Sequence, residues 1–267
     1  MITHTPAILD HDTLRRLAPS IFADSPWEGM SRRYRMVPTI EVVGMPADRG
    51  FRPVRAGQSR SRIAGKGDFT RHLIRSRHDG YLGHAAGAEV PELVLTNSHD
   101  GTSAYRFMSG IFRLVCSNGL VVQSSDFGSI GVRHSGGADF ERRVIDATYE
   151  VIEDAPRTLE KIEAWKAIEL TPPQREAFAR TAIEVREATV EITPAQVLAP
   201  RRGKDRRPDL WTTANVIQES IIRGGVRGVS ATTGRRMRTR AVASVAEDVR
   251  LNRALWALTE RMAELVS

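Results

Sequence analysis

Side chains that could do chemistry gather in the stretch from Phe69 to His78, FTRHLIRSRH. If this stretch is a β-strand, its side chains alternate between two faces, and Arg71, Arg75 and Arg77 share one of them. Their guanidinium groups would then lie about 7 Å apart or a multiple of it, close to the phosphate spacing of an extended nucleic-acid strand. The pattern predicts a stripe of cations that follows a phosphate backbone, although an edge strand also uses positive charge to prevent aggregation.

Histidines recur every six residues in this region, at His72, His78 and His84. Their spacing matches no compact zinc motif, and no cluster of carboxylates supports them. Cys116 is the only cysteine, so an intramolecular disulfide is impossible, and its apolar surroundings predict a buried thiol. We therefore expect no metal and no cofactor.

A metal-dependent nuclease is a further hypothesis, with His72, His78 and Asp100 as the residues to mutate. Magnesium chemistry generally needs two or more convergent acids, and the basic stretch offers only Asp68 and Asp79, with Asp100 further along the chain. The turn NSHDGT explains His99 and Asp100 by hairpin geometry alone. The glycines around Lys66 lack the spacing of a phosphate-binding P-loop. We expect no catalytic residue and no enzymatic activity.

The charge of the chain is segregated along its length. Residues 31–78 hold twelve Lys and Arg against three acids, and residues 200–240 hold eleven against three. Residues 139–191 hold eight against thirteen. Two cationic regions separated by an acidic one are typical of a protein with a polyanionic partner.

Two groups of cations are therefore predicted to neutralise phosphates. One lies in the first cationic region, and the other runs from just before a glycine pair to the end of the second. The residues are Arg60, Arg62, Lys66, Arg71, Arg75, Arg77, Arg223, Arg227, Arg235, Arg236, Arg238 and Arg240. Phe69, Tyr81 and Tyr105 are the aromatic residues near the first group that could stack on bases, although burial in the core explains each of them as well.

Hydrophobic patterning predicts an α+β fold, in which an antiparallel β-meander over about residues 37–134 packs against helices from the C-terminal half. The strand candidates are 39–43, 51–60, 69–78, 93–95, 103–116, 120–122 and 127–132. Helical patterns cover 140–190 as a long amphipathic arm, then a helix from Asp209 to the glycine pair 224–225, and a final helix after Ser244. The glycine-containing basic segment 228–240 is expected to be a loop.

The same patterns suggest how the chain is divided. Residues 1–36 form a poorly defined lead-in, residues 37–198 contain the sheet and the helical arm, and residues 199–208 are an exposed basic linker. Residues 209–267 form a helical segment that packs on the same core, so one compact unit is expected. The helical arm makes a homo-oligomer plausible.

No apolar run approaches the roughly 20 residues needed to span a bilayer, and the N-terminal residues have no signal pattern. We expect a cytoplasmic protein without a membrane partner.

Four separated motifs resemble a known family. FTRHLIRSRH, NSHDGTSAYRFMSGIFRLVCSNGLVV, LWTTANVIQESIIRGG and RLNRALWALTERM are similar to the phage/plasmid-like family called domain of unknown function 932, over roughly Val37 to Met262. That resemblance implies a setting on plasmids, phages or integrative elements and supplies no catalytic residue. The order of a meander, the strand FGSIGV and the helix FERRVIDATYEVI is also similar to the core of the Rad fifty-two-like single-strand annealing proteins.

Together these observations predict a nucleic-acid-binding accessory protein of a mobile element, most concretely a factor that binds or anneals single-stranded DNA through arginines. The alternative is an anti-defence interaction protein that blocks a host immune complex, in which the cations would meet an acidic surface.

Overall fold

A computed structural model describes residues 8–31, 34, 36–84, 89–113, 119–121, 130–132, 138–186 and 189–266. The chain divides into two compact units, where the sequence suggested one. Unit 1 consists of Met1–Ser117, Val121–Pro156 and Ser244–Ala246, and unit 2 consists of Asn118–Leu120, Arg157–Ala243 and Glu247–Ser267.

The N-terminal residues of unit 1 fold into short helices: α1 (His11–Leu17), the 3-10 helix η1 (Pro19–Phe22), α2 (Thr39–Gly44) and the 3-10 helix η2 (Met45–Arg49). Asp10 caps α1 by accepting a hydrogen bond from the backbone N–H of Thr13 at 2.8 Å. Residues 39–43 were predicted as a strand, which is wrong. Their apolar residues instead bury one face of α2, with Val42 fully buried, and this packing overrides the strand propensity of the sequence.

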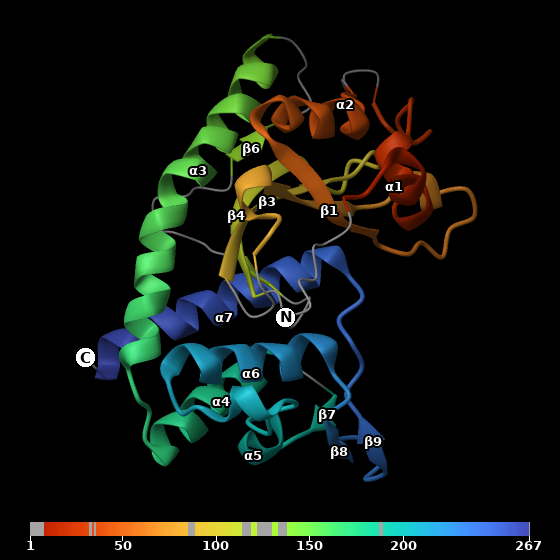
Figure 1. Cartoon of the computed structure of the whole chain (residues 1–267). Helices are drawn as coiled ribbons and strands as arrows, with labels where there is room; N and C mark the ends of the chain where they lie inside the picture. Colours follow the sequence, from red (N-terminus) through yellow and green to blue (C-terminus); the bar gives the residue numbers. More distant parts are fainter. Residues whose placement is uncertain are drawn as a thin grey trace. The chain divides into compact units, whose positions relative to one another are not determined.

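The main sheet of unit 1 is antiparallel, with strand order β1-β2-β3-β4-β5 and β6 paired to β4. Figure 1 shows β1 with α1 beside it. Two 3-10 helices, η3 (Gly67–Phe69) and η4 (Asp79–Tyr81), flank β2. The strands are β1 (Phe51–Gln58), β2 (His72–His78), β3 (Glu89–Asn97), β4 (Tyr105–Arg113), β5 (Gly119–Val121) and β6 (Ile130–Val132). The predicted antiparallel meander and the α+β class are confirmed, and Cys116 lies outside the described residues.

The two faces of this sheet differ in chemistry. One face supplies Ile74, Leu95 and Phe107 to a hydrophobic core that also contains Leu14 and Ile21 from the N-terminal helices. The segment expected to be a lead-in therefore contributes core residues. Because side chains alternate along a strand, Arg75, Arg77 and Glu92 lie on the opposite face.

Unit 2 is mainly helical. Trp165, Trp211 and Trp256 pack together at its centre, with ring centroids 4.7 to 6.4 Å apart. Asp209 caps α6 by accepting from the Thr212 N–H at 2.7 Å, as its sequence predicts. Helices α3 and α7 also contribute residues to unit 1. The helices are α3 (Ala138–Ala167), α4 (Pro172–Arg186), α5 (Pro194–Val197), the 3-10 helix η5 (Gly203–Arg206), α6 (Leu210–Arg223) and α7 (Val245–Val266).

A small antiparallel sheet completes unit 2, in the order β7 (Val190–Glu191), β8 (Arg227–Ser230) and β9 (Arg236–Arg238). The segment 228–240 was expected to be a loop, and the structure corrects this, since β8 and β9 form a hairpin. Gly228 permits the close approach of β7, because a Cβ at this position would lie 2.3 Å from the carbonyl oxygen of Glu191.

In the part of the chain that the structure describes, no helix combines the length and the apolar character needed to cross a membrane.

Candidate nucleic-acid interface

Two of the arginines predicted to face solvent are buried inside unit 1. Arg75 and Arg77 are 8% and 3% exposed, and both bind the carboxylate of Glu92, which is 0% exposed. The Arg75 Nε to Glu92 Oε2 distance is 2.6 Å, and the Arg77 Nη2 to Glu92 Oε1 distance is 2.5 Å. Burial lowers the pKa of the Arg75 guanidinium, although Glu92 opposes this shift. Arg75 and Arg77 do share a face of β2, and Arg71 precedes this strand. The expected stripe of surface cations is wrong for Arg75 and Arg77.

The remaining predicted cations of unit 1 lie in and beside the β1–β2 connection. The Nζ of Lys66 lies 3.1 Å from Asp100 Oδ2, and Arg71 donates a hydrogen bond to the carbonyl oxygen of Thr102. Both side chains therefore have structural partners. Arg60 and Arg62 are exposed, and neither makes an ion pair with any residue in the described ranges.

The histidines proposed for a nuclease have structural partners. His72 is fully buried, with Nδ1 2.9 Å from Ser20 Oγ and Nε2 2.9 Å from Thr39 Oγ1. His78 Nδ1 accepts a hydrogen bond from the Gly80 backbone N–H. Among the residues that the structure describes, no three His, Cys, Asp or Glu side chains gather as metal ligands.

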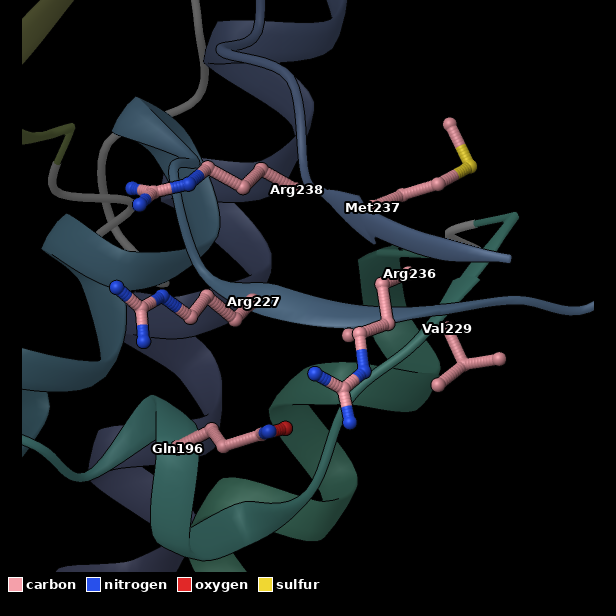
Figure 2. A pocket seen from close by; sticks show the side chains of 7 residues that line it. Gln196, Arg227, Val229, Arg236, Met237 and Arg238 are labelled. Atoms are coloured by element: carbon pink, nitrogen blue, oxygen red, sulfur yellow. The ribbon is translucent and has the colours of Figure 1, made fainter. Parts of the chain in front are cut away.

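The β8–β9 hairpin of unit 2 places three predicted arginines on one face. Arg227 lies directly opposite Arg238, and Val229 lies opposite Arg236. Because every second residue of a strand shares a face, these four side chains lie on the same side of the hairpin, and all four are exposed. In Figure 2, Arg227 and Arg238 extend in the same direction, and Arg236 turns toward Gln196.

This face contributes to a pocket of about 580 Å³, called the arginine pocket below. Its lining residues are Gln196, Arg227, Gly228, Val229, Arg236, Met237 and Arg238.

The polar side chains of the arginine pocket present hydrogen-bond donors to a ligand. Gln196 belongs to the capping box of α5, and its Oε1 accepts from the Thr193 N–H at 2.8 Å. Its amide NH₂ makes no hydrogen bond within the described part of the chain and can donate to a ligand in the pocket. Arg238 makes one long hydrogen bond, 3.5 Å from Nη1 to the Gly225 carbonyl oxygen. Arg227 and Arg236 make no hydrogen bond or ion pair with the residues described here. A pocket of this composition suits an anion.

The other predicted cations of unit 2 lie around this hairpin. Arg223 ends α6 and pairs with buried Glu219 at 2.8 Å, and Arg202 pairs with the same carboxylate at 2.7 Å. Burial raises the pKa of Glu219, but the hydrogen bonds from Arg202 and Arg223 outweigh burial and hold that pKa below its usual value. Arg235 and Arg240 are exposed. The structure thus brings Arg227, Arg236 and Arg238 together.

The segment expected to be an exposed linker is tied into unit 2. Asp205 is 3% exposed and accepts from Arg202 at 3.0 Å, and Arg201 donates to the carbonyl oxygen of Gly224. Gly224 has a φ of 64°, and a Cβ there would lie 2.5 Å from the backbone of Arg240. These contacts fix the position from which the hairpin leaves α6.

A family model matches residues 26–256, and its description is "Domain of unknown function (DUF932)". The chain belongs to this family. Two relatives from Escherichia coli strain K12 are similar over 256 residues, UPF0380 protein YafZ at 42% identity and UPF0380 protein YfjQ at 41%. Each alignment covers 95% of this chain and 91% of the relative. No solved structure gives a significant match.

The DUF932 match includes both the β1–β2 connection and the β8–β9 hairpin. Sequence reasoning missed four contributors to the arginine pocket, Gln196, Gly228, Val229 and Met237. The spacing of two residues between Arg227 and Val229, and between Arg236 and Arg238, is typical of two strands, but the neighbouring glycines favoured a loop. No sequence signal pointed to Gln196, because its place in the pocket depends on tertiary packing.

Proposed function

We propose that this DUF932 protein binds nucleic acid through phosphate contacts in the arginine pocket, with single-stranded DNA as the preferred form. It would act as an accessory protein of a mobile element and catalyse no reaction. The observation that supports this proposal is a pocket whose charged side chains are three arginines, two of them without a partner among the described residues.

The spacing of the arginines suits a chain of phosphates better than one small anion. Arg236 and Arg238 are two residues apart on β9, which corresponds to about 6.8 Å along a strand. Two successive phosphates of an extended single strand can therefore each meet a guanidinium group. Between Arg223 and Arg240 the sequence contains six arginines and no acid, so no carboxylate of this segment competes with the phosphates.

The hairpin also gains stability from a bound anion. Like charges directly opposite each other on neighbouring strands destabilise the pair, and Arg227 faces Arg238 in this way. A phosphate between the two guanidinium groups would turn this repulsion into two charge-assisted hydrogen bonds.

The test is a binding titration of the full chain with a labelled thymidine oligonucleotide at 50 and 200 mM salt. We expect tight binding that weakens steeply with salt, because phosphate neutralisation releases counterions. Absence of binding at 50 mM salt would overturn the proposal and favour the anti-defence alternative, in which the arginines contact an acidic protein surface.

A further inference from the structure

One tryptophan of this protein differs from the other three. Trp165, Trp211 and Trp256 are 4%, 2% and 1% exposed and pack together in the core of unit 2. Trp27, in unit 1, is partly exposed and lies against Phe69, which is also partly exposed. Their ring centroids are 5.4 Å apart, with the ring planes tilted by 58°.

Backbone hydrogen bonds hold this aromatic pair in place. The Trp27 N–H donates to the carbonyl oxygen of His99 at 3.0 Å, and the His99 N–H donates to the carbonyl oxygen of Phe69 at 3.0 Å. Gly65, in the β1–β2 connection, lies beside the Trp27 ring, since a Cβ at Gly65 would be 3.9 Å from Cζ3. Three segments distant in sequence thus meet at the two rings.

The other aromatic residues considered from the sequence are less suitable as stacking surfaces. Tyr105 is fully buried, with its hydroxyl bonded to the carbonyl oxygen of Val37. Tyr81 packs against His84, with ring centroids 5.2 Å apart, and against His78 at 6.5 Å.

Among the described residues, charges of both signs lie close in sequence to Trp27 and Phe69. Exposed Arg60 and Arg62 follow β1, while exposed Glu28 and Asp68 are sequence neighbours of the two rings. Lys66 is neutralised by Asp100. The two aromatic rings, and not a cluster of arginines, distinguish this surface from the arginine pocket.

We infer that Trp27 and Phe69 form a stacking surface for unpaired bases, through which unit 1 recognises single strands. This inference rests on the proposed function and adds its substrate class. Bases stacked in a duplex cannot reach the rings, whereas unpaired bases of any sequence can, because every base has a π-face.

The experiment compares the Trp27→Ala variant with a matched control, Tyr81→Ala, which removes another partly exposed aromatic ring of unit 1. For a thymidine oligonucleotide we expect Trp27→Ala to weaken binding by about 5- to 150-fold and to leave the slope of log affinity against log salt unchanged. The Tyr81→Ala control should bind the oligonucleotide within about twofold of the wild-type affinity, and Trp27→Ala should bind duplex DNA within about twofold, because neither case loses a stacked base.

Tryptophan fluorescence provides a second readout that does not depend on the folding of the alanine variant. The oligonucleotide should quench the emission of the wild-type protein, and Trp27→Phe, which keeps an aromatic ring, should abolish that quenching. Salt-dependent binding without quenching, together with an unchanged affinity of Trp27→Ala, would overturn the stacking inference and leave the proposed function standing. Loss of the salt response itself would overturn the proposed function.

Discussion

The arginine pocket makes a quantitative prediction about the salt dependence of binding. Arg227 and Arg236 are exposed and have no partner within the described part of the chain, so each is available to neutralise one phosphate. For single strands, each neutralised phosphate contributes about 0.7 to the slope of log affinity against log salt. The double variant Arg227→Gln, Arg236→Gln should therefore reduce the slope by about 1.4. Between 50 and 200 mM salt, the wild type should therefore lose about 7-fold more affinity than the double variant.

Fluorescence anisotropy of a labelled thymidine oligonucleotide at five salt concentrations would measure this slope. The matched control is Arg180→Gln, Arg261→Gln, which removes two exposed arginines of unit 2 that are paired with Glu176 and Glu264 on their own helices. The control should keep the wild-type slope. Equal slopes for the two double variants would refute the reasoning, because overall charge alone would then explain binding.

The single substitution Arg227→Gln should weaken binding but stabilise the fold, so the two effects can be told apart. Arg227→Gln removes the like-charge pair with Arg238, so the free energy of unfolding should rise by a few tenths of a kcal/mol. Differential scanning fluorimetry without ligand would show this change. A clear decrease in melting temperature would mean that Arg227 has a structural role instead.

Three further predictions concern stability and pH. Glu92→Gln removes the carboxylate that two buried guanidinium groups share and should lower the free energy of unfolding by about 3–5 kcal/mol in urea titrations; a loss below about 1 kcal/mol would contradict the burial of this ion pair. Thr39→Val removes the hydroxyl that four buried polar groups surround and should cost about 1–3 kcal/mol, whereas an unchanged unfolding midpoint would show that these groups find other partners. The pKa of Glu219 lies below its usual value in the folded chain, so its stabilising contribution is complete above about pH 4.3 and is lost as the pH falls further. Unfolding followed by tryptophan fluorescence should show this acid sensitivity in the wild type, and a Glu219→Gln variant that melts identically at pH 6 would contradict it.

The strands of the sheet could be predicted from the sequence because the patterns that define them lie within single strands and turns. Alternating apolar residues and the Asp100-Gly101 turn signal place β3 and β4, and the patterns of 51–60 and 69–78 place β1 and β2. The strand prediction for residues 39–43 failed because four of the five residues are β-branched and favour strands, yet the burial of Val42 against the core selects a helix.

The candidate site was less predictable, since exposure depends on tertiary contacts. Alternation correctly put Arg75 and Arg77 on one face, but the sequence could not show that Glu92 of the neighbouring strand faces both. The same limit explains why Trp27 was not considered. Its contact with Phe69 depends on a hydrogen bond from Trp27 to His99, which is 72 residues further along the chain.

Hydrogen–deuterium exchange of the β8–β9 hairpin tests the central claim most directly. Peptides that cover residues 225–241 should exchange more slowly when a saturating thymidine oligonucleotide is bound, while α4, at residues 172–186, should be unaffected and serves as the internal reference. If the complex forms and exchange in the hairpin does not change, nucleic acid binds elsewhere and the arginine pocket is not the interface.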